Sequence, residues 1–135
     1  MRRILVVDDE APIRGLLVAA LTAPGSEVLD AEDGDGALEL ARQHQSFDLV
    51  VTDIVMPGMN GIDLARRLRG GFNVRRFLFV SGFSEIESID RTLEEFERAE
   101  FLNKPFSILE LLRIVDHLCA PLPAPAPKES LQSQV

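Results

Sequence analysis

The chain has 135 residues, 46 % of them hydrophobic and 27 % charged, a composition that suits one globular domain with its own core. Its net charge of −8 is opposite in sign to that of general nucleic-acid binders, and its single cysteine excludes an intrachain disulfide. No stretch resembles a signal peptide or a membrane span, so we expect a soluble cytoplasmic protein that binds neither nucleic acid nor membrane.

The first predicted element is a strand over residues 4–7, where a continuous apolar run rich in β-branched residues favours burial on both faces. The acidic run at residues 8–10 ends this strand, and Pro12 suits the first turn of a helix. Apolar side chains at helical spacing continue this helix to Pro24-Gly25, where we expect it to stop.

A second strand is predicted over residues 27–31, and because it is more polar we place it nearer an edge of the sheet. Gly34-Asp35-Gly36 has the composition of a turn. The next helix should therefore begin at Ala37 and fade by Gln45.

The central stretch FDLVVTDIVMPGMNG, residues 47–61, contains a buried strand that ends at Asp53. A turn is predicted at residues 56–58, and a helix from Asn60 to Gly70-Gly71. At the end of a strand the backbone of an aspartate is held by the sheet while its carboxylate can face solvent, which suits a nucleophile or a metal ligand. Aspartate also favours turns, so a role in starting the turn alone stays open.

Two more strands follow the central stretch. Residues 77–80 predict a buried strand that ends at Ser81-Gly82, and Phe101-Leu102 predicts a short strand that ends at Lys104-Pro105. Between them, Ser84 and Glu87 have the spacing of a capping box and predict the start of an acidic helix.

The last predicted helix begins at a second capping box, formed by Ser107 and Glu110, and its apolar face extends to Leu118. From Ala120 on, the chain alternates prolines with small residues and then becomes polar, so it cannot build a core. We therefore expect one folded domain over residues 1–120 and a Pro-rich disordered tail over residues 121–135.

Strands and helices thus alternate five times along the chain. This pattern predicts an α/β fold, with a parallel sheet covered by helices on both faces and connected by right-handed crossovers. In such sheets the ligand site lies beyond the carboxyl ends of the strands.

Polar side chains stand at these strand ends in a particular order: Asp8 and Asp9, then Asp53, Ser81 and Lys104. We expect them to converge on one shallow pocket. Taken singly, each has a structural alternative: Asp8 or Asp9 as a helix cap, Ser81 as a turn residue, and Lys104 as a solvated charge. The joint occurrence favours a site.

The charges of this set indicate phosphoryl transfer. Three carboxylates close together repel, and a hard divalent cation such as Mg²⁺, with Lys104 beside it, would neutralise them. A metal and an ammonium flanking Asp53 would stabilise the equatorial oxygens of a phosphoryl group while that carboxylate attacks phosphorus. The product is an aspartyl phosphate, to which the Ser81 hydroxyl can donate a hydrogen bond.

Four segments together resemble the receiver domain of two-component response regulators, the chemotaxis-regulator-like fold: ILVVDDE, LVVTDIVMPGMNG, FVSG and FLNKPFS. The resemblance covers residues 3–118. It implies a flavodoxin-like fold, in which a five-stranded parallel sheet of order 2-1-3-4-5 is doubly wound with five helices.

The resemblance also implies partners and metal ligands. In that family the middle aspartate receives its phosphoryl group from a histidine kinase or a histidine phosphotransfer protein, which implies Asp53 as the phosphoacceptor. It further implies Mg²⁺ binding by Asp9 directly, by Asp8 largely through water, and by the backbone carbonyl of Val55.

A switch is implied by the same resemblance. Ser81 would be the switch hydroxyl, Lys104 the phosphate-contacting lysine in a cis Lys104–Pro105 peptide, and Phe101 the switch aromatic residue. Phosphorylated Asp53 would draw Ser81 inward and let Phe101 fill the vacated space. The face made by the fourth helix, fifth strand and fifth helix would change, and a downstream protein would bind there.

The implied protein is a switch that catalyses only its own phosphorylation and dephosphorylation, either as a stand-alone regulator or as the receiver of a hybrid kinase. One alternative is a Mg²⁺-dependent phosphohydrolase using Asp53, although Val55 stands where such enzymes usually have a second acid. Another is a receiver-like interaction module that is never phosphorylated.

Overall fold

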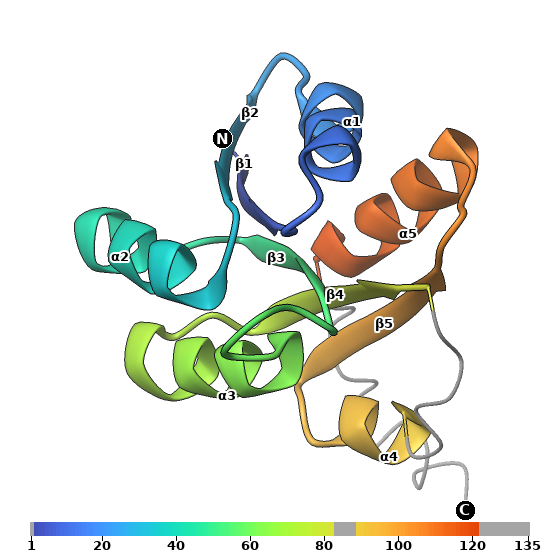
Figure 1. Ribbon diagram of the computed structural model, residues 1–135. Coiled ribbons are helices and arrows are strands. Elements are labelled where there is room, and N and C mark those ends of the chain that lie inside the picture. Colours follow the sequence, from blue (N-terminus) through green and yellow to red (C-terminus); the bar gives the residue numbers. More distant parts are fainter. Residues whose placement is uncertain (1, 83–88, 122–135) are drawn as a thin grey trace, which may run out of the picture.

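A computed structural model describes residues 2–82 and 89–121 and shows a five-stranded parallel sheet of order β2-β1-β3-β4-β5, as predicted (Figure 1). The strands are β1 (Arg2–Val7), β2 (Ser26–Ala31), β3 (Leu49–Asp53), β4 (Arg76–Ser81) and β5 (Arg98–Asn103). The helices are α1 (Ala11–Leu21), α2 (Gly34–His44), α3 (Gly61–Phe72), α4 (Ile89–Glu94) and α5 (Ile108–Cys119).

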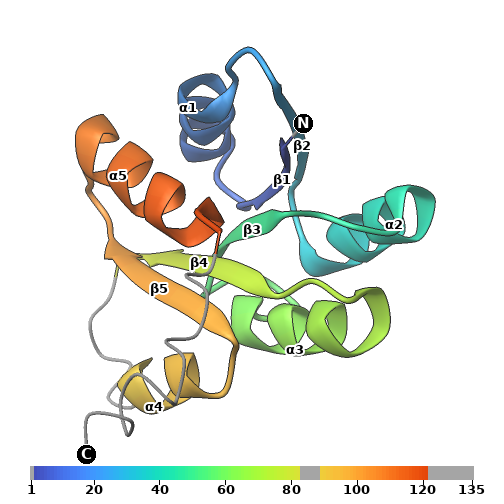
Figure 2. The ribbon, with the colours of Figure 1, turned by 180° about the vertical axis from the view of Figure 1, so that it is seen from behind.

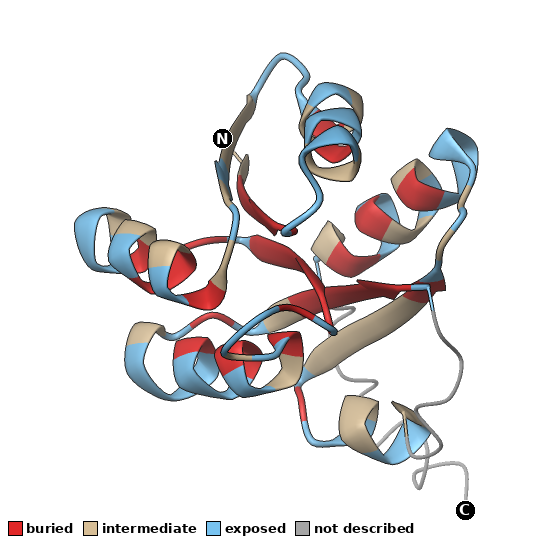
Figure 3. Cartoon of the chain, in the orientation of Figure 1, coloured by how far each residue is buried: buried red, intermediate tan, exposed pale blue. Residues whose placement is uncertain are grey.

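Helices cover both faces of the sheet and enclose two separate cores. Helices α1 and α5 lie on one face, and α2 and α3 lie on the other (Figures 1 and 2). The central strands β1, β3 and β4 are buried along almost their whole length, so their side chains contribute to both cores (Figure 3). This is why these strands appear in the sequence as continuous apolar runs rather than as alternating patterns.

The start of α2 differs from the prediction. Gly34, Asp35 and Gly36 form the first turn of the helix rather than a separate turn before it. The carboxylate of Asp33 accepts a hydrogen bond from the backbone N–H of Gly36 at 2.8 Å, and this N-cap stabilises a first turn that has low intrinsic helix propensity.

The end of α3 also differs from the prediction, because the helix continues through Gly70-Gly71 to Phe72. Phe72 packs against the core shared by α2 and α3, which favours one more turn than the two glycines indicate. The helix then ends at Asn73 in a left-handed conformation, with φ of 58°, a common way for helices to stop.

Strand β5 is longer than the predicted pair of residues, since it pairs with β4 from Arg98 to Asn103. Its first residues are polar because β5 is an edge strand. The guanidinium of Arg98 donates hydrogen bonds to the carbonyls of His117 at 2.7 Å and Ala120 at 2.9 Å, at the C-terminal end of α5. A polar edge residue thus satisfies helix carbonyls that would otherwise lack a partner.

Two predicted helix starts are confirmed by their caps. The Asn60 side chain accepts a hydrogen bond from the N–H of Asp63 at 2.8 Å, and the Ser107 hydroxyl accepts one from the N–H of Glu110 at 3.0 Å. The capping box predicted at Ser84 and Glu87 and residues 122–135 of the predicted tail lie outside the described residues.

A cluster of four residues, here called the Glu95 clamp, joins α3 to the segment between α4 and β5. Arg66 donates two hydrogen bonds to the Glu95 carboxylate, both at 2.9 Å, and Arg69 donates to the Glu95 carbonyl at 2.8 Å. The Arg69 guanidinium lies 4.8 Å from the ring centroid of Phe96, which is itself buried against Phe77 and Phe79. The clamp therefore connects a surface ion pair to the aromatic core.

We expect Glu95→Gln to lower stability by about 0.5–1 kcal/mol, the usual range for a partly exposed ion pair. The Arg66 hydrogen bond lowers the pKa of Glu95, so the contribution is present above the pKa of the unfolded chain and is lost as the pH falls through the folded-state pKa. Urea denaturation at pH 7 and at successively lower pH measures the difference, which should shrink as the pH falls.

Glu94→Gln is the matched control, because Glu94 forms no ion pair with any residue in the ranges 2–82 and 89–121. Equal effects of the two substitutions at pH 7 would show that the clamp does not contribute to stability.

Candidate functional site

The polar side chains predicted to converge do so at the carboxyl edge of the sheet. Asp8 follows β1, Asp53 and Ser81 end β3 and β4, and Lys104 follows β5. The parallel register places these strand ends level with one another, since Val7 pairs with Thr52, Asp53 with Val80, and Ser81 with Asn103. Asp8, Asp53 and Ser81 are buried, with relative exposures of 0 %, 6 % and 1 %.

Lys104 is the centre of the charge arrangement. Its ammonium nitrogen lies 3.0 Å from Oδ2 of Asp8, 3.0 Å from Oδ2 of Asp53 and 3.2 Å from Oε1 of Glu10. The backbone N–H of Lys104 donates to the carbonyl of Ser81 at 2.8 Å, and the Lys104–Pro105 peptide bond is cis. One cation thus joins carboxylates from two strand ends and from the start of α1.

Burial and the neighbouring Asp8 carboxylate raise the pKa of Asp53 above its ordinary value. Lys104 and the Val55 N–H, which donates to Oδ1 of Asp53 at 3.3 Å, oppose this rise only in part. Burial by itself lowers the pKa of Lys104, but the neighbouring Asp53 and Asp8 carboxylates outweigh that effect and hold the pKa above its usual range. The ammonium is therefore fully charged at neutral pH.

Glu10 belongs to the site although the sequence analysis did not include it. Carboxylate oxygens of Asp8, Glu10 and Asp53 all lie within 4.8 Å of one another. Asp9 is exposed and lines the same cavity, but it is not a member of this group. The sequence could have indicated Glu10, because side chains alternate in direction along an extended segment. Asp8 and Glu10 are two residues apart and so project to the same side, whereas Asp9, between them, projects to the other.

The cavity at this edge has a volume of about 430 Å³. It is lined by Asp9, Glu10, Asp53, Val55, Ser81, Gly82 and Lys104. Val55 is 57 % exposed, so an apolar residue stands on the solvent side of the cavity that the Asp53 carboxylate lines. This geometry admits a small anionic group to Asp53 from solvent.

The predicted switch residues lie on one face of neighbouring strands. Phe101 pairs with Phe79, two residues before the pair formed by Ser81 and Asn103. Ser81 and Phe101 therefore project toward the same side of the sheet, and Phe101 is half-buried against the core of α2 and α3.

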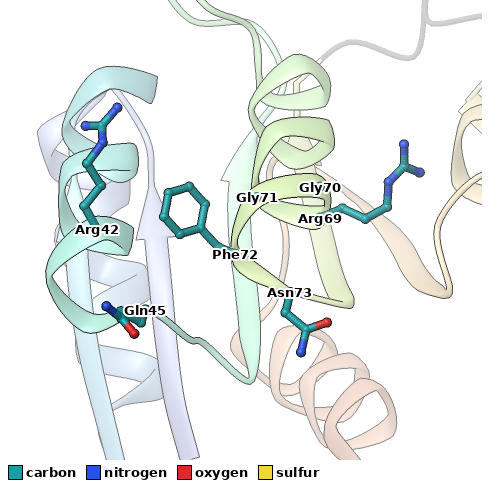
Figure 4. Close-up of a pocket in the computed structure, with 7 residues that line it drawn as sticks. All are labelled: Arg42, Gln45, Arg69, Gly70, Gly71, Phe72 and Asn73. Atoms are coloured by element: carbon teal, nitrogen blue, oxygen red, sulfur yellow. The ribbon is translucent and has the colours of Figure 1, made fainter.

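A larger hollow of about 580 Å³ lies between the C-terminal ends of α2 and α3, away from this edge. Figure 4 shows Phe72 of α3 directed toward Arg42 of α2, with Arg69 extending away from both. The residues that line it include neither a carboxylate nor any predicted site residue, so we place the function at the smaller cavity.

The donor set at the carboxyl edge fits Mg²⁺. Its protein ligands would all be oxygens, which hard divalent cations prefer. Oδ2 of Asp8 is fully buried and accepts no hydrogen bond from the described residues, although the Lys104 ammonium lies near it. A buried carboxylate oxygen without a hydrogen bond is a group that a cation can satisfy.

Comparison with known proteins identifies the class. Residues 4–116 match the family model of the response regulator receiver domain, and the chain belongs to this family. Receiver domains are signalling switches of two-component systems rather than classical enzymes. Within the described residues, no helix has the length and apolar character needed to cross a bilayer.

Individual relatives support this assignment. The chain is 34 % identical over 118 residues to the response regulator receiver protein CpdR of Brucella abortus, covering 87 % of this chain and 97 % of that one. It is 38 % identical over 116 residues to the sensor kinase CckA of the same organism, covering 85 % of this chain and 12 % of the kinase. The chain spans less than half the length of several relatives that it matches.

Among solved structures, the response regulator TrrA of Thermotoga maritima, in complex with Mg²⁺ and beryllium fluoride, superposes with a TM-score of 0.73. It is 35 % identical, and the match covers 87 % of this chain and 99 % of TrrA.

Proposed function

We propose that this chain is a phosphorylation-controlled switch of a two-component phosphorelay, acting in the cytoplasm. Asp53 would accept a phosphoryl group from a histidine kinase or a histidine phosphotransfer protein. The observation that supports this most directly is the placement of the buried Asp53 carboxylate at an open cavity, 3.0 Å from the Lys104 ammonium and close to two further carboxylates. Similarity to part of a sensor kinase supports a partner of the kinase class.

The proposed reaction is an exchange of one phosphorus bond for another. An Asp53 carboxylate oxygen forms a bond to phosphorus while the bond from phosphorus to the donor's histidine nitrogen breaks, and the bond electrons leave with the imidazole. Lys104 supplies positive charge to the oxygens of the transferring group, and the Ser81 hydroxyl can donate a hydrogen bond to one of them.

Asp8, Asp9, Asp53 and the carbonyl of Val55 would hold Mg²⁺, which supplies charge neutralisation for the phosphoryl oxygens. After transfer, Ser81 would move toward the phosphoryl group and Phe101 would follow on the same face of the sheet. The face formed by α4, β5 and α5 would then differ between the two states and bind a downstream protein.

We expect acetyl phosphate with Mg²⁺ to add one phosphoryl group to the intact chain, and Asp53→Asn to abolish the addition. Intact-mass spectrometry measures the adduct directly. Asp116→Asn is the matched control, because Asp116 is 76 % exposed on α5 and pairs with Arg2 at the start of β1, the end of that strand opposite to Asp8. This variant should therefore keep the adduct. An adduct that persists in Asp53→Asn would refute the proposal.

The phosphohydrolase alternative predicts turnover rather than a stoichiometric adduct. The exposed, apolar Val55 side chain argues against it, because it cannot act as a general acid or base. Release of many equivalents of phosphate from small phosphoesters would favour the hydrolase, and a wild-type chain without any adduct would favour the interaction module.

A further inference from the structure

The start of α1 has an unusual cap. Glu10 occupies the N-cap position, where Ser, Thr, Asp and Asn are preferred, and its side chain makes no capping hydrogen bond. Instead, the carboxylate reaches across to the Lys104 ammonium at 3.2 Å, while the Glu10 N–H donates to Oδ1 of Asp8 at 2.9 Å. The chain thus forgoes a side-chain cap on α1 and contacts the site lysine instead.

The number of donors on Lys104 limits what this lysine can bind. An ammonium group has three N–H donors, and three carboxylates already lie within 3.2 Å of it. The Asp53 and Glu10 carboxylates accept hydrogen bonds from the ammonium, and the buried Asp8 carboxylate is a third anionic neighbour. A phosphoryl oxygen on Asp53 would be a further acceptor that competes with these partners.

Burial decides which partner gives way. The Asp8 and Asp53 side chains are 0 % and 7 % exposed, whereas the Glu10 side chain is 60 % exposed. A buried carboxylate that loses its cation remains desolvated and costly, but Glu10 can rotate into water and be solvated there.

We propose that Glu10 is a positioning residue that holds Lys104 in the resting state and competes with the phosphoryl group for the ammonium. This inference rests on the proposed function of Asp53 as phosphoacceptor. Phosphorylation expels Glu10 from Lys104, so a carboxylate moves from the cavity to the surface at the start of α1. Glu10 therefore weakens binding of the phosphoryl group, and its release changes the charge on the surface at the start of α1.

The test uses beryllium fluoride as the phosphoryl analogue, titrated into the full-length chain at saturating Mg²⁺, with Mg²⁺ affinity measured separately for each variant. Glu10→Gln removes the charge and keeps the shape, and we expect it to bind beryllium fluoride about two- to fivefold more tightly, the range expected for a partly exposed ion pair. The difference should shrink at high salt.

Two further variants distinguish an effect of the Glu10–Lys104 ion pair from a general effect of negative surface charge. Glu10→Asp keeps the charge but shortens the side chain by one methylene, so it should bind the analogue as tightly as Glu10→Gln does. Glu39→Gln is the matched control, since its side chain is also 60 % exposed and also lies 3.2 Å from a cation, Arg42, on α2. This control should bind like the wild type.

The side-chain carboxyl resonance of Glu10, followed by ¹³C NMR, provides a readout that a purely structural role would not change. We expect it to shift toward the value of a solvated glutamate when beryllium fluoride binds. An unmoved resonance, or wild-type affinity in both Glu10 variants, would overturn the inference while leaving the proposed function intact. A wild-type chain that does not bind beryllium fluoride at all would overturn the proposed function and this inference with it.

Discussion

Gly61→Ala should destabilise the protein by about 1–3 kcal/mol or more, the range for overpacking a well-packed site. A Cβ on Gly61 would collide with the backbone carbonyl of Asp53 and approach Cα of Ile54, and the Gly61 N–H already donates to the Ile54 carbonyl at 2.8 Å. Backbone atoms held in a sheet cannot rotate away as a side chain can. Urea denaturation measures the loss.

Gly70→Ala is the matched control within the same helix. A Cβ at Gly70 would meet no atom of the described residues within 4 Å, and alanine is favoured over glycine in helix interiors by about 0.5–1 kcal/mol. We therefore expect this control to stabilise the protein, so the two substitutions should change the free energy of unfolding in opposite directions. A Gly61→Ala variant as stable as the control would contradict the close contact between α3 and the end of β3.

Asp53→Asn should raise the melting temperature when a chelator removes divalent cations. Because the folded state raises the pKa of Asp53, ionisation of this carboxyl costs stability as the pH rises above the unfolded-state value, and the cost is complete above the folded-state value. Asparagine removes this cost of ionisation, so the variant should be more stable than the wild type at pH 7. The gain in stability should disappear as the pH falls below the pKa range of an ordinary aspartate. Each 1 kcal/mol gained would raise Tm by about 4 °C in a domain of this size.

Mg²⁺ should reverse the order of the two melting temperatures, so that the wild type melts above Asp53→Asn. A ligand that binds only the folded state at a hundred times its Kd stabilises it by about 2.7 kcal/mol, so the wild type should gain this amount and Asp53→Asn should gain much less. Thermal unfolding with chelator and with Mg²⁺ measures all four values. A variant that melts below the wild type in chelator, or gains as much from Mg²⁺, would contradict the role of Asp53 in a shared acidic site.

The convergence of Asp8, Asp53, Ser81 and Lys104 was predictable because each strand end is marked by an abrupt change from apolar to polar residues, whereas the order of the strands was implied by the resemblance to receiver domains. In a parallel sheet such ends must meet at one edge, so no long-range information was needed to bring them together.

The errors occurred where local composition and tertiary context disagree. The glycines that begin α2 indicate a turn, but the Asp33 cap outweighs their low propensity. The polar start of β5 gives no apolar pattern, and only pairing with β4 defines it. The alternation with Asp8 could have indicated Glu10, but its contact with Lys104, 94 residues away, is not encoded by a local pattern.

The Glu95 clamp has a mechanical consequence for α4. It fixes the segment just beyond the C-terminal end of α4 to α3, so we expect that end of the helix to stay in place if the helix moves. If the proposed switch starts at Ser81, it should therefore change the angle of α4 more than its position. A partner protein on this surface would sense a change of angle.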